Sequence, residues 1–214
     1  MEASDQSTKP RRNPEPHRID GRQQRALRTK QAIIEAYLAL LRENPQVPTS
    51  AQIAERAGCS PRSVFERFSD MGQLGLAAID HVIGLGLSTP VGDKAESDRK
   101  LRLKFQVGTR ARICETWLPL WRVLVRHQDE SDKVKVRINY IRDAIRGRLQ
   151  LMYRPELSIL SEAEREHTLI ALEALTDFES WGQMRERHGL SFEVACTVWV
   201  SMIDRLLPPT PLEV

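Results

Sequence analysis

Hydrophobic positions along most of the chain recur every three or four residues with polar residues between them, which is the pattern of amphipathic helices. The first three stripes span about residues 25–44, 49–58 and 60–68, and a fourth begins near Asp70. No segment shows alternating apolar and polar residues bounded by hairpin turns, as a half-buried strand would. The pattern therefore predicts an all-α protein.

Specific start and stop signals bound the two short helices. Thr49 and Gln52 have the spacing of a capping box, in which each side chain bonds a backbone N–H of the first turn. Gly58 can adopt the left-handed conformation that ends a helix, and Ser60 followed by Pro61 favours a new start. Two short helices joined by a tight turn, after a longer helix, predict a helix-turn-helix unit whose second helix can lie in a DNA major groove.

The second of these short helices has two faces. We expect Val64, Phe65 and Phe68 to point inward. The other face carries side chains that can read base edges or hold phosphates. These are Arg62, Ser63, Glu66 and Arg67. Helix-turn-helix geometry also occurs in proteins that never bind DNA, so the spacing leaves a purely structural role open.

Positive charge is concentrated near the N-terminus. Twelve Lys and Arg residues and six Asp and Glu residues lie between Lys9 and Arg67, a net charge of +6, whereas the whole chain carries +3. The first 24 residues contain several prolines and almost nothing apolar, so we expect residues 1–24 to form a flexible basic arm. This asymmetry is expected of a segment that meets a polyanion, although a solvated basic tail explains it equally well.

The segments that carry a family resemblance lie between about Arg25 and His81. They are Ile33-Ile34-Glu35-Ala36, residues 49–60 (TSAQIAERAGCS) and residues 63–68 (SVFERF). Together they resemble the DNA-binding domain of the TetR family of transcriptional regulators. The specific part is an Ile-Ala-x-x-Ala-Gly-x-Ser block followed by an aromatic-x-x-Phe pair.

The resemblance implies a domain organisation and a function. It implies a three-helix DNA-binding domain at 25–85 and a larger helical bundle at 86–214, which binds a small-molecule inducer and ends in a dimerising pair of helices. The protein would be a homodimeric repressor that binds a double-stranded DNA operator with inverted symmetry and is released by its inducer. Family members that activate transcription also exist.

From the pattern and the resemblance together, we expect nine residues to contact DNA. They are Arg25, Arg28, Thr49, Ser60, Pro61, Arg62, Ser63, Phe65 and Arg67. Arg62 and Ser63 are the first choice for base contacts. Two positions depart from the family pattern, which usually has Tyr at Phe65 and commonly Lys at Met71, and both of those side chains often contact phosphates. Neither Phe nor Met can do so, which predicts a different division of phosphate contacts.

The larger half continues the helical pattern. After a linker containing Gly86, Ser88, Pro90 and Gly92, we expect helices at 97–116, with an interruption at Pro119, and at 131–153, 161–187 and 191–207. Aromatic and polarizable side chains in these helices are candidates for the wall of a ligand cavity. These candidates are Phe105, Cys114, Trp117, Trp121, Tyr140, Phe178 and Trp181. For any one of them, ordinary core packing is the simpler explanation.

Two arginines of the same stretch, Arg110 and Arg112, could pair with an anionic ligand or could lie on a solvated helix face. The last two predicted helices carry a broad apolar stripe, which we expect to form the dimer interface. Its residues are Leu169, Leu172, Thr176, Ala195, Val198, Trp199, Met202, Ile203 and Leu206. A stripe does not show which chain it faces, so packing within one chain stays an alternative.

Several kinds of site have no sequence signal. The chain lacks the glycine-rich nucleotide motifs and the hydrolase elbow, and the Glu164-x-x-His167 pair has no second copy, so we expect no enzyme, cofactor or metal. Three widely spaced cysteines suggest neither disulfides nor a metal site, and no apolar run is long enough to span a membrane, which favours a cytoplasmic protein. A ligand-independent architectural DNA binder, a helical small-molecule-binding protein without DNA activity and a protein-binding adaptor stay open.

Overall fold

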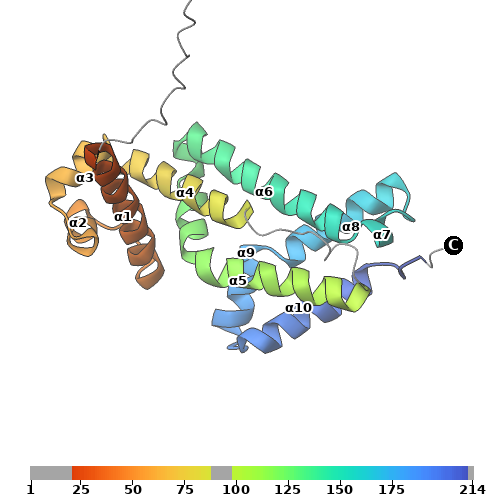
Figure 1. Cartoon of the computed structure of the whole chain (residues 1–214). Coiled ribbons are helices and arrows are strands. Elements are labelled where there is room, and N and C mark those ends of the chain that lie inside the picture. The colour runs from red at the N-terminus through yellow and green to blue at the C-terminus, as the bar shows by residue number, and fades with distance from the viewer. Residues whose placement is uncertain (1–20, 88–97, 212–214) are drawn as a thin grey trace, which may run out of the picture.

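The computed structural model describes residues 21–87 and 98–211, and every regular element in these ranges is helical (Figure 1). The helices are α1 (Gly21–Glu43), α2 (Ser50–Ala57), α3 (Pro61–Arg67), α4 (Met71–Leu87), α5 (Arg99–Arg126), α6 (Asp132–Met152), α7 (Arg154–Leu157), α8 (Glu162–Leu175), α9 (Phe178–Gly182) and α10 (Phe192–Leu206). A short 3₁₀ turn (Gln128–Glu130) precedes α6, and a π-helical turn (Gln183–Arg187) follows α9. The predicted all-α class is confirmed.

Helices α1, α2 and α3 form the predicted helix-turn-helix unit. The Thr49 backbone N–H donates to Gln52 Oε1 at 2.8 Å, and the Gln52 N–H donates to Thr49 Oγ1 at 3.3 Å, which is the predicted capping box. Gly58 is left-handed, with φ +66°, and the Ser63 N–H donates to Ser60 Oγ at 3.2 Å at the start of α3. All three local signals therefore place the helices as predicted.

Helix α4 joins the two parts of the molecule. Asp70 caps it by accepting a hydrogen bond from the Gln73 N–H at 2.8 Å. Figure 1 shows α4 running from the helix-turn-helix unit toward the space between α5 and α6. The helix continues through Gly86, where a linker was expected, to Leu87. The predicted loop residues Ser88, Pro90 and Gly92 lie outside the described residues.

The N-terminal boundary also differs from the prediction. Residues 21–24, which were expected to belong to the flexible arm, form the first turn of α1. The rest of the predicted arm, residues 1–20, lies outside the described part of the chain. A helix can begin before its apolar stripe does, because the first turn needs only helical backbone angles and solvent for its side chains.

Helix α5 runs without interruption through Pro119, so the predicted break is wrong. A proline inside a helix removes one hydrogen bond and costs about 3 kcal/mol. The flanking side chains of Leu118, Leu120 and Trp121 are buried, and α5 packs on α1, α6, α9 and α10 along its length. This burial offsets the cost, which the local sequence does not reveal.

The predicted helix at 161–187 is broken, whereas α6 and α10 match their predictions within a few residues. Helix α8 ends at Leu175, and the Asp177 carboxylate accepts a hydrogen bond from the Glu179 N–H at 2.9 Å, which starts α9. The Thr176 carbonyl accepts a hydrogen bond from Arg110 Nε at 2.9 Å. A buried arginine and a new cap together therefore end α8. No described helix is both long and apolar enough to cross a lipid bilayer.

Candidate DNA interface and ligand cavity

Helix α3 buries a narrow face and exposes the rest. Val64 and Phe68 are buried in the core against α1, as predicted. Phe65 is 50% exposed, so its predicted inward orientation is wrong. Consecutive residues of a helix differ in direction by about 100°, so Phe65 cannot share the face that Val64 and Phe68 occupy one turn apart. The aromatic ring is instead available at the surface of the unit.

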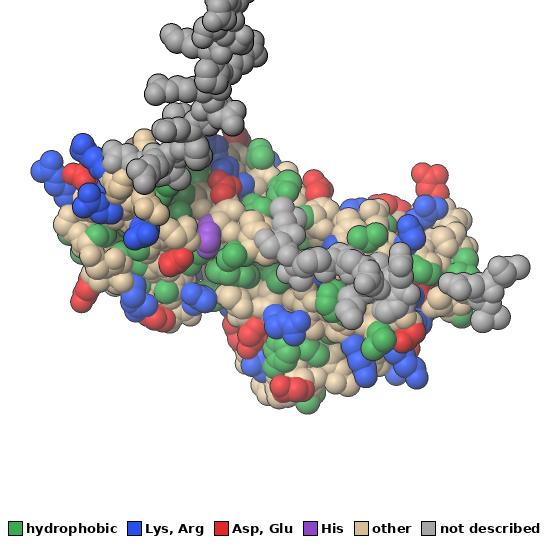
Figure 2. Space-filling view, in the orientation of Figure 1, with side chains coloured by type: hydrophobic (Ala, Val, Ile, Leu, Met, Phe, Trp, Pro, Cys, Tyr) green, Lys and Arg blue, Asp and Glu red, His purple; other side chains and the backbone are tan. Residues whose placement is uncertain are grey.

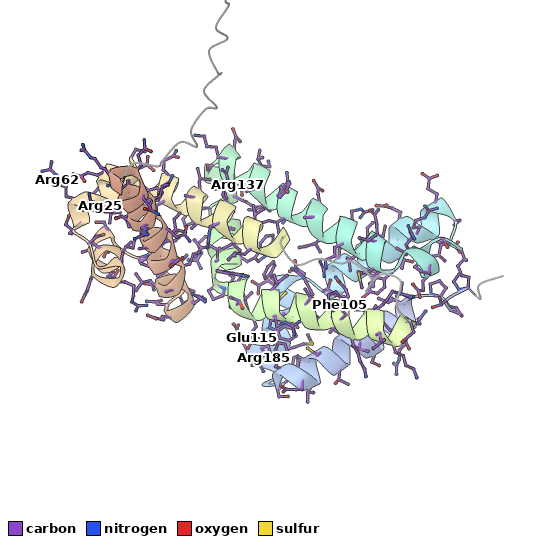
Figure 3. All side chains as sticks on the ribbon, in the orientation of Figure 1. Arg25, Arg62, Phe105, Glu115, Arg137 and Arg185 are labelled. Carbon is purple, nitrogen blue, oxygen red and sulfur yellow. The ribbon has the colours of Figure 1, made fainter. Side chains whose placement is uncertain are left out.

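The polar face of α3 is open to solvent. The Arg62 side chain is 88% exposed, and its Nε donates to Glu66 Oε1 at 3.0 Å within the same helix. Figure 3 shows Arg62 and Arg25 projecting at the same end of the molecule, and Figure 2 shows Lys and Arg side chains gathered there. Of the nine predicted DNA contacts, eight are exposed and Ser63 is half-buried. The arrangement presents guanidinium and hydroxyl groups around one short helix.

Arg67 occupies a different position from Arg62. It lines a polar groove with Lys30 of α1 and with Lys133 and Arg137 of α6. The Arg137 guanidinium holds Asp80 of α4 at 2.6 and 2.7 Å, and this ion pair raises the pKa of Arg137. The structure therefore places Arg67 beside α4 and α6, where it borders the junction between the two parts of the molecule.

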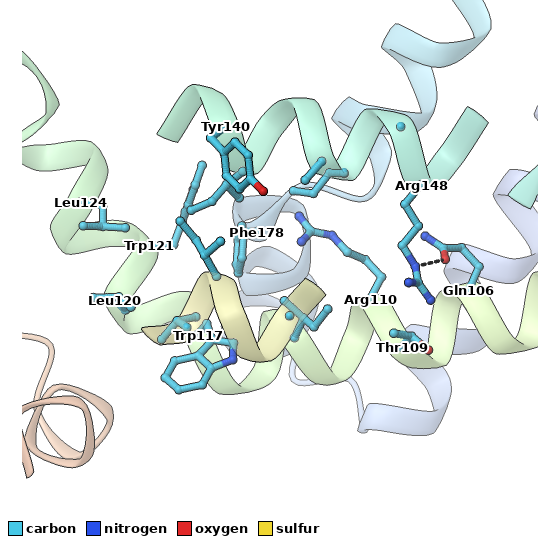
Figure 4. Close-up of a pocket in the computed structure, with 18 of the residues that line it drawn as sticks. Gln106, Thr109, Arg110, Trp117, Leu120, Trp121, Leu124, Tyr140, Arg148 and Phe178 are labelled. Carbon is cyan, nitrogen blue, oxygen red and sulfur yellow. Dashed lines mark hydrogen bonds between the residues drawn. The ribbon is translucent and has the colours of Figure 1, made fainter. Parts of the chain in front are cut away.

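A cavity of about 530 Å³ lies in the larger half, between α4, α5, α6 and α9 (Figure 4). Four predicted ligand candidates line it. They are Trp117, Trp121, Tyr140 and Phe178. The Trp121 and Phe178 rings stack with centroids 4.8 Å apart. This volume and mostly apolar wall are typical of small-molecule sites.

The other three candidates do not line the cavity. Phe105 packs beside it under the Arg148 guanidinium, at 5.8 Å. Cys114 is completely buried, and burial raises the pKa of its thiol to about 11. Trp181 packs on Trp199, with ring centroids 4.9 Å apart, and is part of the neighbouring core. For these three residues, core packing is the better interpretation.

One end of the cavity is polar. Gln106, Thr109, Arg110 and Arg148 line it, and Arg110 and Arg148 are its charged side chains. Arg112 is exposed on the opposite side of α5 and does not line the cavity, so the two arginines considered together in the sequence are separated. Arg148, Thr109 and Gln106 were missed because their position depends on how α5 packs against α6.

Most of the predicted dimer interface is core within a single chain. Six of its nine residues are buried and unavailable to a second copy. They are Leu169, Leu172, Thr176, Ala195, Trp199 and Ile203. Val198 and Met202 are half-buried and Leu206 is 42% exposed, and Ile170 and Val194 are exposed on the same two helices. The stripe is broad because its inner part packs on α5 and its outer part faces solvent.

No family model matches the chain, and no curated protein matches it in sequence. Solved structures match it well. A TetR-family regulator from Streptomyces coelicolor superimposes with a TM-score of 0.66 at 18% identity, over 83% of this chain and 79% of that one. A protein from a Rhodococcus species assigned to the same family gives 0.62 at 17% identity, over 85% and 100%. One from Mesorhizobium loti gives 0.62 at 14% identity, over 85% and 96%. The chain therefore has the fold of the TetR-family transcriptional regulators.

Proposed function

We propose that this protein is a sequence-specific DNA-binding transcriptional regulator that reads the major groove with α3. The observation that carries the proposal is the exposed polar face of α3, on a helix that is held at both ends by its caps and by the burial of Val64 and Phe68. A helix held rigidly by its buried side can present Arg62 and Ser63 to base edges. The fold shared with DNA-binding regulators supports this assignment.

The proposed regulator acts as a homodimer on an operator with inverted symmetry. Two recognition helices must meet half-sites about 34–36 Å apart, or a multiple of that spacing. The outer apolar residues of α8 and α10 support a dimer face. These are Ile170, Val194, Val198, Met202 and Leu206. Figure 1 shows α8 and α10 in the larger half of the molecule, away from α3, so a second copy bound there leaves the proposed DNA-binding face open.

A small molecule in the cavity would act as an inducer through α4. Leu74 of α4 is fully buried with the core of the helix-turn-helix unit, whereas Val82, Ile83 and Gly86 of the same helix line the cavity. Trp117, in the cavity wall, also lies under the Arg42 guanidinium of α1, at 5.6 Å. A ligand that favours another position of α4 lowers DNA affinity through its differential binding to the two states, which makes the protein a repressor without ligand.

Selection of binding sites from random duplex DNA tests the proposal. The retained duplexes are then compared with scrambled duplexes at two salt concentrations. We expect an enriched inverted repeat and two chains per duplex in sedimentation. Sequence-blind, salt-sensitive binding would instead indicate an architectural DNA binder, and no binding would indicate a small-molecule-binding protein without DNA activity.

A variant pair tests the dimer separately. Val194→Glu places a charge in the proposed α8–α10 face, and we expect monomers and at least tenfold weaker binding to the inverted repeat. Val136→Glu places the same charge on α6, at another exposed valine outside that face, which is 64% exposed against 49% for Val194. The control should stay dimeric. Dimers of Val194→Glu with unchanged affinity would contradict this interface.

A further inference from the structure

The cavity between α5 and α6 is divided into an apolar end and a cationic end. Figure 4 shows Tyr140, Trp121 and Leu124 on one side and Arg148 with Gln106 on the other. Trp117 and Leu120 extend the apolar part of the wall. No Asp or Glu is among the described residues that line it, whereas Arg110 and Arg148 both line it. This division, rather than the volume, points to the chemistry of the ligand.

The surroundings of Arg110 give the strongest indication of an anionic ligand. Its residue is 6% exposed, its Nε donates to the Thr176 carbonyl at 2.9 Å, and its guanidinium lies over the Phe178 ring at 4.4 Å. None of the ion pairs between described residues includes Arg110. A buried guanidinium is costly unless an opposite charge compensates it. The carbonyl and the ring hold the side chain in place and leave its charge uncompensated.

Two further groups of the same wall fit an anion. The Arg148 Nε donates to Gln106 Oε1 at 2.8 Å, and burial lowers the pKa of Arg148. The Thr109 residue is 5% exposed, and its hydroxyl has no hydrogen-bond partner within the described residues. A buried hydroxyl without a partner is uncommon in native proteins, and it can donate to a ligand oxygen here.

We propose that the cavity binds an amphipathic monocarboxylate, with the carboxylate held by Arg110, Arg148 and Thr109 and the hydrocarbon body against the aromatic end. This proposal rests on the ligand-binding role inferred above, and it assigns a chemical class to the small-molecule inducer of the proposed regulator. A guanidinium binds a carboxylate through charge-assisted hydrogen bonds, and often through two of them. The aromatic end provides apolar contact for an alkyl or aryl chain. A neutral ligand would leave the Arg110 guanidinium uncompensated.

Three probes of equal chain length test the class: decanoate, decan-1-ol and decylamine. Two of the four tryptophans of the chain line the cavity, so intrinsic fluorescence reports binding without DNA. We expect decanoate to bind at least tenfold more tightly than decan-1-ol, and decylamine to bind most weakly. Equal affinity for decanoate and decan-1-ol, or no saturable binding of decanoate, would overturn the proposal.

Variants locate the carboxylate. Arg148→Met and Thr109→Val should each weaken decanoate binding, by at least tenfold and about threefold, and leave decan-1-ol binding unchanged. Arg110→Met should have the largest effect, but it also removes the bond to Thr176, so the other two variants keep the test independent of folding. Arg112→Met, on the exposed side of α5, is the matched control and should change nothing. Equal losses for decanoate and decan-1-ol in Arg148→Met would contradict an anion site.

A separate measurement distinguishes this class from the regulatory role. Decanoate is added to the complex with the selected inverted repeat, and release of DNA is followed by anisotropy. Release by decanoate that Arg148→Met abolishes would support both proposals. Tight decanoate binding without release would support the ligand class and contradict induction by it. Release by decan-1-ol at the same concentration as decanoate would contradict the proposed carboxylate ligand. It would still support the proposed ligand-controlled DNA binding.

Discussion

Arginine has opposite surroundings in the two parts of the molecule. In α3 the Arg62 side chain is 88% exposed, so its charge stays in water and contributes little to folding. In α5 the Arg102 side chain is 5% exposed and pairs with Glu156, which is fully buried. The exposed Arg62 is available to an external polyanion. The buried Arg102 has lost its contact with water and forms an ion pair within the chain instead.

The difference shows how charge relates to function in this protein. An exposed guanidinium can be replaced without unfolding the protein, so any effect appears in binding. A buried guanidinium is part of the fold when a carboxylate compensates it, as at Arg102. At Arg110, where no described carboxylate does so, it is the basis of the proposed anion site. Substitutions can therefore separate three roles of one residue type.

The largest effect is expected at the buried pair. Arg102→Met leaves the Glu156 carboxylate with Arg99, 3.8 Å away, and with Thr210, and should lower the free energy of unfolding by about 3 kcal/mol. Urea denaturation measures it. Arg56→Gln breaks the exposed Arg56–Glu43 pair and should cause no measurable change. The double variant Arg102→Met/Glu156→Met should recover much of the loss, and a double variant no more stable than Arg102→Met would show that packing, not charge, causes it.

The next effect concerns the exposed arginine and appears only in binding. Arg62→Ala should weaken binding to the selected inverted repeat by about 10- to 100-fold and leave binding to scrambled duplex nearly unchanged, because a base contact carries sequence information. Stability should not change. Arg187→Ala removes the same charge from an exposed position after α9 and is the control. A parallel loss on both duplexes would assign Arg62 to the phosphates instead.

The two parts of the molecule also differ in how much of their structure could be predicted from the sequence. In the helix-turn-helix unit, Thr49 with Gln52, Gly58, and Ser60 with Pro61 act over three or four residues, so their spacing alone gave the helix boundaries. Phe65 is the exception, because an aromatic side chain next to two buried positions can still lie on an exposed face of the helix. Local hydrogen bonds fix this part of the fold, and local patterns predict it.

In the bundle, the deciding contacts are distant in sequence. The bond from Arg110 to Thr176 that helps to end α8 joins residues 66 positions apart, and the bond from Arg148 to Gln106 in the cavity joins residues 42 apart. Aromatic content alone predicted Trp117, Trp121, Tyr140 and Phe178 together with three residues of the core. The polar end of the cavity exists only when two helices pack, so the sequence alone did not reveal it.

A smaller effect is expected at a turn that local geometry determines. Gly58→Ala should lower the free energy of unfolding by about 1 kcal/mol, because φ is +66° and a Cβ there would meet no neighbour, so the cost is purely conformational. Gly147→Ala in α6 also meets no neighbour but has a helical backbone, and should raise stability by roughly 0.5–1 kcal/mol. Thermal or urea unfolding measures both. A Gly58→Ala variant that is as stable as the parent or more stable would show that the turn relaxes to accept a Cβ.

The smallest effect tests the departure at Phe65. Phe65→Tyr adds a hydroxyl to a half-exposed ring and should tighten binding to every duplex about twofold to threefold, because the new hydrogen bond to a phosphate replaces hydrogen bonds to water at an exposed site and contributes only about 0.5 kcal/mol. The salt dependence should not change, since no charge is added. Met71→Lys, by contrast, should steepen it by about one unit. Weaker binding of Phe65→Tyr would show that the bare ring packs on an apolar part of the groove, such as a thymine methyl, so that a hydroxyl at this position disturbs the contact.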